Sequence, residues 1–98
     1  MNITKTVNEK DFIVSIDGRL DTTTAPQFEE FMVENISKMS TLTLDCAGLE
    51  YVSSAGLRVL LSAQKKMQQI GSMKVINVCE EVMEVFEITG FADILVIE

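Results

Sequence analysis

The sequence predicts an α/β fold with a mixed, largely parallel sheet and helices packed on it. Segments with strand patterns alternate with helical segments in the order β-β-α-β-α-β-α-β, which is typical of parallel strands joined by right-handed crossovers. Only a short polar stretch separates the first two strands, so they should form an antiparallel hairpin and make the sheet mixed. A chain of 98 residues suits one domain, residues 1–98.

The first half of the chain should contain a hairpin, a helix and a third strand. Asn8 begins a polar stretch that suits a tight turn, and apolar and polar residues alternate along the strand after it. Thr24 and Gln27 fit a helix capping box, and Pro26 suits the first helical turn, where its missing N–H costs nothing. The expected elements are strands at 2–7 and 11–17, a helix at 24–38 and a strand at 41–46.

The second half should contain two helices, each followed by a strand. Leu57 and Leu60 lie on the apolar side of the first of these helices, opposite a polar stripe. Gly71 and Gly90 follow the two helical patterns, where glycine commonly ends a helix. The expected elements are a loop at 47–53, a helix at 55–70, a strand at 73–78, a helix at 80–89 and a strand at 94–97.

Composition and charge exclude several classes of function. Eight Lys and Arg against 15 Asp and Glu give a net charge of −7, so binding to nucleic acid is not expected. The chain has no His, two Cys and no glycine-rich nucleotide motif, which argues against an enzyme, a metal site or a cofactor. It has neither a secretory signal nor an apolar run long enough for membrane insertion. We therefore expect a cytoplasmic protein with a protein partner.

One segment, residues 45–61, carries a functional signal. A strand leads into a loop that ends in Ser53 and Ser54, and an apolar helix begins at once. Ser54 is predicted at the N-cap, where its hydroxyl could simply accept a backbone hydrogen bond. Alternatively, Ser54 could accept a phosphate, because a helix N-terminus offers unpaired N–H groups and partial positive charge. A phosphate would add about −1.5 to −2 charges to the surface, and Gly56 leaves the approach open.

Four short motifs occur in a definite order along the chain. They are Gly18 to Asp21 (Gly-Arg-Leu-Asp), Ser53 to Leu57 (Ser-Ser-Ala-Gly-Leu), Gln69 to Gly71 (Gln-Ile-Gly) and Phe86 to Phe91 (Phe-Glu-Ile-Thr-Gly-Phe). Together they resemble the anti-sigma-factor antagonist family of STAS domains, over nearly the whole chain. The resemblance implies a STAS-like fold and a regulatory module that has no catalysis of its own.

The resemblance also implies a mechanism of partner switching that regulates transcription. In that family the unphosphorylated antagonist binds an anti-sigma factor that is also a serine kinase, phosphorylation releases it, and a PP2C-type phosphatase resets it. Counting from Gly56 places the phosphoacceptor at Ser54, and Asp21 takes a supporting role near it. The predicted partner-binding residues, which lie in or directly beside the first two motifs, are Asp21, Thr22, Ser53, Ser54, Ala55, Gly56 and Arg58.

Some positions depart from the family pattern and leave alternatives open. Ser53 stands where Asp is common, which makes it the second candidate for phosphorylation, and Ala55 replaces a common Ser or Thr. Arg58 stands where Gly is common, one turn beyond Ser54 on the same helical face; it either pairs with the phosphate or is simply solvated. A different role is an adaptor subunit of a lipid-transport ATPase complex or of a stress-signalling scaffold, which needs no phosphate.

Overall fold

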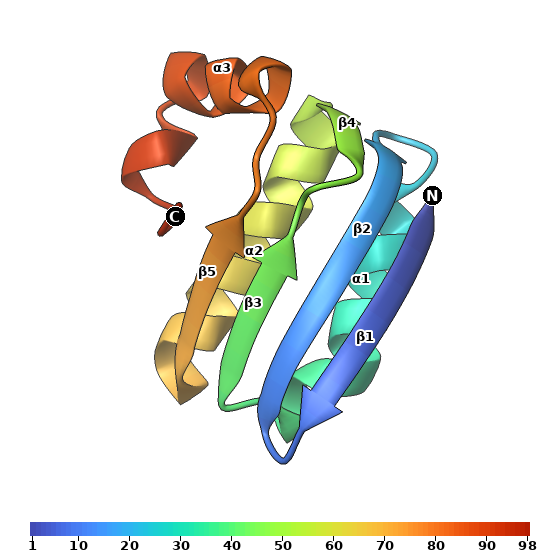
Figure 1. Cartoon of the computed structure of the whole chain (residues 1–98), viewed down its shortest axis with the longest axis vertical. Helices are drawn as coiled ribbons and strands as arrows, with labels where there is room; N and C mark the ends of the chain where they lie inside the picture. The colour runs from blue at the N-terminus through green and yellow to red at the C-terminus, as the bar shows by residue number, and fades with distance from the viewer.

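The computed structural model describes all residues, 1–98, as one sheet with two helices covering one of its faces (Figure 1). A third helix lies at one end of the sheet. The strands are β1 (Asn2–Asn8), β2 (Asp11–Leu20), β3 (Thr41–Asp45), β4 (Leu49–Val52) and β5 (Ser72–Ile76). The helices are α1 (Ala25–Asn35), α2 (Ser54–Ile70) and α3 (Glu80–Thr89), with short 3₁₀ turns η1 (Ile36–Lys38) and η2 (Phe91–Asp93).

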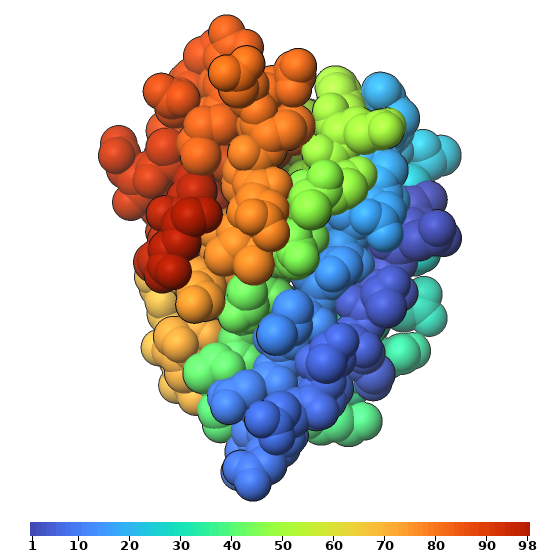
Figure 2. Space-filling model, in the orientation of Figure 1, coloured from blue at the N-terminus to red at the C-terminus, as the bar shows by residue number.

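The sheet is mixed and largely parallel, which confirms the predicted fold class. Its strand order is β1-β2-β3-β5, with β1 antiparallel to β2 and the other neighbours parallel. The short strand β4 pairs with the end of β2, beyond the part of β2 that pairs with β3. Figure 2 shows the uncovered face of the sheet, on which the strands lie side by side and the carboxyl terminus lies against β5.

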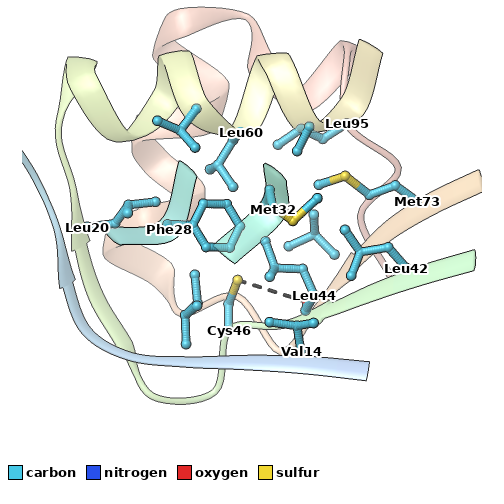
Figure 3. Close-up of a cluster of buried hydrophobic side chains, with 14 of the residues drawn as sticks. Val14, Leu20, Phe28, Met32, Leu42, Leu44, Cys46, Leu60, Met73 and Leu95 are labelled. Atoms are coloured by element: carbon cyan, nitrogen blue, oxygen red, sulfur yellow. Dashed lines mark hydrogen bonds between the residues drawn. The ribbon is translucent and has the colours of Figure 1, made fainter. Parts of the chain in front are cut away.

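A single apolar cluster of 23 buried residues holds the sheet and helices together. Along β2, every second side chain is buried, because successive side chains of a strand point to opposite faces. Figure 3 shows Phe28 and Met32 from α1 and Leu60 from α2 meeting the strand residues. Cys46 lies in this cluster, and burial raises the pKa of its thiol to about 12. Cys46 is therefore a packing residue that stays protonated at neutral pH.

Several of the expected boundaries are wrong. Strand β2 continues beyond residue 17 to Leu20, where it pairs with β4, and β5 ends at Ile76 instead of residue 78. The expected loop at 47–53 contains β4, since Leu49 and Val52 bury their side chains while the segment pairs with β2. The expected final strand at 94–97 is only a single bridge between Val75 and Ile97. The chain first turns through η2, which carries Leu95 into the core and leaves too few residues for a strand.

The first helix is shorter than predicted and is capped differently. It ends at Asn35 and continues only as the 3₁₀ turn η1. The predicted capping box is wrong, because Thr24 and Gln27 have other partners. The Thr24 hydroxyl accepts a hydrogen bond from the Asp21 N–H and donates to the carbonyl of Arg19. The Gln27 side chain donates to the carbonyl of Met1.

Candidate partner-binding site

The end of β2 and the start of α2 come together at the upper end of the sheet in Figure 1. The Ser53 N–H donates to the Leu20 carbonyl over 2.9 Å, so the residues before α2 are tied to the residues before the Asp21 turn. Gly56 makes this approach possible, because a Cβ there would lie 2.6 Å from the Leu20 carbonyl oxygen. The first and second predicted motifs therefore form one surface.

Ser53 caps α2, and Ser54 is the first residue inside the helix. Ser53 is extended, with ψ 177°, and its hydroxyl accepts a hydrogen bond from the Gly56 N–H over 3.3 Å. The prediction that Ser54 is the N-cap is therefore wrong by one residue, because the bond to Leu20 keeps Ser53 strand-like. Ser54 is exposed, and its hydroxyl makes no hydrogen bond within the chain. The two candidate serines thus have different surroundings.

Asp21 organises the turn between β2 and α1. One of its carboxylate oxygens accepts hydrogen bonds from the Thr23 hydroxyl at 2.8 Å and from the N–H groups of Thr23 and Thr24. The Thr23 hydroxyl is the main cause that holds the pKa of Asp21 below its ordinary value; partial burial works in the opposite direction. Asp21 is therefore ionised at neutral pH, with half of its carboxylate committed to the turn.

Two residues that the sequence did not single out complete this surface. The Arg19 guanidinium stacks on the Tyr51 ring with 4.1 Å between its central carbon and the ring centroid. Its Nε lies 3.6 Å from the second Asp21 carboxylate oxygen. Arg19 and Tyr51 are register partners across β2 and β4. The only sequence signal for them was the place of Arg19 inside the first motif and of Tyr51 just before the second, because β4 itself was not predicted.

The remaining predicted partner-binding residues lie around the same edge. Thr22 and Arg58 are exposed, Ala55 is partly buried, and Gly56 is buried beneath the first turn of α2. Arg58 forms no ion pair with a carboxylate of the chain within 4.0 Å. The chain thus brings Asp21, Ser53 and Ser54 to one edge, with Arg58 one helical turn further along α2.

Comparison with known proteins identifies the family. The family model for the STAS domain matches residues 2–98. The chain belongs to the STAS domain family. This STAS domain is 33% identical to the anti-sigma-B factor antagonist of Bacillus subtilis, over 97% of this chain and 88% of that protein.

Solved structures agree with the predicted STAS-like fold. The anti-sigma factor antagonist SpoIIAA in its unphosphorylated form matches 99% of this chain and 88% of its own, with a TM-score of 0.84 and 17% identity. The phosphorylated form of the Bacillus SpoIIAA matches 99% and 91%, with a TM-score of 0.77 and 16% identity. Both relatives carry the names of regulatory antagonists, in agreement with the predicted regulatory module. No helix of the structure is both long and apolar enough to cross a lipid bilayer.

Proposed function

We propose that this protein is an anti-sigma-factor antagonist that works by partner switching. In its unphosphorylated form it binds an anti-sigma factor with serine kinase activity, and phosphorylation of Ser54 releases it. A PP2C-type phosphatase then restores the binding form. The proposal is supported by the relative of the same name, which is similar over 97% of this chain.

The surroundings of Ser53 and Ser54 favour Ser54 as the phosphoacceptor. Its side chain is exposed on the first turn of α2 and makes no hydrogen bond that phosphorylation would break. Ser53 is partly buried, and its hydroxyl is already engaged as the cap of α2. A kinase can therefore reach Ser54 without disturbing the helix, whereas phosphorylation of Ser53 would alter the cap.

A phosphate on Ser54 changes the binding surface more than it changes the fold. The amino-terminal end of α2 carries partial positive charge and free N–H groups, which favour a phosphate. The modification adds about −1.5 to −2 charges to an edge that also contains the ionised Asp21. A partner that docks over this edge would meet altered charge and extra bulk, while the core beneath remains packed.

The test is phosphorylation and binding of Ser54→Ala and Ser54→Asp with an anti-sigma factor of the serine-kinase type from the same organism. Intact-mass measurement after incubation with ATP should show one added phosphate on the native protein and none on Ser54→Ala. Calorimetry should show that Ser54→Ala binds like the native protein, whereas Ser54→Asp binds at least about tenfold more weakly because of its added charge.

Ser53→Ala is the matched control for the neighbouring hydroxyl. It should still accept one phosphate, although loss of the cap should lower the stability of the domain by about 1 kcal/mol. Normal phosphorylation of Ser54→Ala together with none on Ser53→Ala would move the acceptor to Ser53. Binding that no kinase reaction changes would instead favour a constitutive adaptor, and no binding to any anti-sigma factor would refute the proposed function.

A further inference from the structure

The cations of this acidic chain are distributed unevenly. Helix α2 carries three of the eight Lys and Arg residues and none of the 15 Asp and Glu residues. All three cations are exposed, and none lies within 4.0 Å of a carboxylate. A helix that needed charge only for solubility would commonly pair it with acids one turn away. The three cations are Arg58, Lys65 and Lys66.

These cations share the solvent-facing side of α2. Leu60 points from the helix into the core (Figure 3), whereas Arg58 and Lys65 are exposed and two helical turns apart. Together with Leu61, Ser62 and Lys66 they line a shallow hollow. At 1.5 Å per residue, this face extends about 10 Å along the helix from Arg58 to Lys65. It is called the basic face below.

We propose that the basic face, formed by Arg58, Ser62, Lys65 and Lys66, is a docking surface for an acidic surface of a protein partner. Opposite charges across an interface accelerate association and fix its register. The rest of the chain argues for a protein rather than for a polyanion, because five cations and 15 acids elsewhere would repel a nucleic acid or an anionic membrane. A protein whose acidic patch is no larger than this face can contact α2 while its acids stay away from the acids on the rest of the chain.

The identity of that partner rests on the proposed function, in which it is the anti-sigma factor. The basic face begins one turn beyond Ser54, so a phosphate there would place negative charge at its edge. It would offset part of the positive charge of the three cations and would repel the acidic patch. The placement explains how one phosphate can weaken binding on a chain that is already acidic, since the surface that it alters is locally positive.

The test compares two double charge reversals that change the net charge equally. Lys65→Glu/Lys66→Glu reverses the basic face. Lys10→Glu/Lys74→Glu changes the β1–β2 turn and the sheet face opposite α2, and Lys74 makes only an exposed pair with Glu98 at 3.6 Å. Affinity for the anti-sigma factor is measured at low and at high salt. The first variant should bind at least about tenfold more weakly at low salt and show a flatter salt dependence, whereas the second should change less than about twofold.

A second measurement separates this proposal from the proposed function. A deca-glutamate peptide is titrated into the isotope-labelled protein, and amide shifts should move in residues 58–66 of the native protein but not in Lys65→Glu/Lys66→Glu. If both double variants bind the anti-sigma factor equally, the docking proposal is wrong and the antagonist function stands. If the native protein binds no anti-sigma factor, the antagonist function fails and the peptide titration alone decides the docking proposal.

The other molecule that could cover the basic face is a second copy of this chain. The exposed side of α1 carries Glu29, Glu30 and Glu34 around Val33, so it could oppose the basic face of another copy. Sedimentation of the native protein should show a monomer at the concentrations used for binding. A dimer that Lys65→Glu/Lys66→Glu dissociates would overturn the proposal, because the basic face would then be covered by the chain itself.

Discussion

At the scale of single residues, Asp21 links the turn before α1 to the edge that contains Ser54. One carboxylate oxygen receives the Thr23 hydroxyl and two N–H groups, and the other faces Arg19. These contacts favour the charged carboxylate, so the pKa of Asp21 lies below its ordinary value of 3.8. The stability that they contribute is present above pH 3.8 and is lost as the pH falls through the lower pKa of the folded protein.

Thr23→Val should raise the pKa of Asp21 toward its ordinary value. Valine has a similar shape but lacks the hydroxyl that contributes most to the lowered pKa. The pKa is read from the carboxyl carbon shift of Asp21 in an NMR titration. Since the folded and unfolded pKa values become more alike, the variant should also lose less stability than the native protein when the pH falls below about 4. Thr22→Val is the control, because Thr22 is exposed and makes no bond to Asp21. An Asp21 pKa that stays the same in Thr23→Val would assign the shift to the backbone N–H groups.

The sequence indicated which kinds of residue form the site, but it did not assign every residue its role. Two adjacent serines before an apolar helix indicate a cap and an exposed hydroxyl, yet the sequence cannot say which serine does which. The choice depends on the bond from the Ser53 N–H to Leu20, a contact between distant segments. The same holds for Arg19 and Tyr51, whose stacking depends on the pairing of β2 with β4.

At the scale of elements, Gly56 fixes how closely α2 approaches the sheet. A Cβ at this position would lie 2.6 Å from the Leu20 carbonyl oxygen and less than 3.0 Å from the side chains of Leu20 and Val52. All of these atoms belong to buried residues that cannot rotate away. The first turn of α2 therefore depends on glycine, although alanine is the better helix former by about 1 kcal/mol.

Gly56→Ala should lower the free energy of unfolding by about 1–3 kcal/mol, because overpacking outweighs the gain in helix propensity. Urea denaturation measures this value, and binding to the anti-sigma factor should weaken as α2 shifts. Gly48→Ala is the matched control. Its Cβ would meet the end of the exposed Asp17 side chain, which can move aside, so its stability should change by less than about 0.5 kcal/mol. Equal stability of the two variants would show that α2 can move away from β2 at no cost.

The elements with a clear local pattern were predicted, among them the 17-residue helix α2 and the five-residue strands β3 and β5. Strand β2 was predicted only over 11–17, although it continues to Leu20, because its last residues are ordered by pairing with β4. Strand β4 has only four residues and forms because β2 offers an edge beside it. The expected final strand is replaced by η2 and one bridge, because burial of Leu95 decides the path of the chain there.

At the scale of the whole molecule, the fold and the proposed switch occupy separate regions. The core cluster lies between the sheet and the helices and contains no ionisable residue except Cys46, whose thiol pKa of about 12 keeps it neutral. Ser54 and the cations of α2 lie on the surface, outside this core. Charge can therefore change at the surface without removing any buried contact. The sequence predicted this separation only in part. The net charge of −7 describes the whole chain and does not show that the residues of α2 are locally positive.

Phosphorylation of Ser54 should consequently leave the fold intact. A phosphate on the first turn of an exposed helix should stabilise the domain by at most about 1 kcal/mol, which raises the melting temperature by no more than about 4–8 °C for a domain of this size. Amide shifts in the phosphorylated protein should move in residues 19–24 and 51–58, which surround Ser54, and should stay fixed in β5 and α3. Ser54→Asp serves as the control for charge without phosphate, and its shifts should move in the same residues by smaller amounts. Shifts that spread through β5 and α3 would mean that the phosphate rearranges the whole sheet, and release of the partner would then come from a change of conformation and not from altered surface charge.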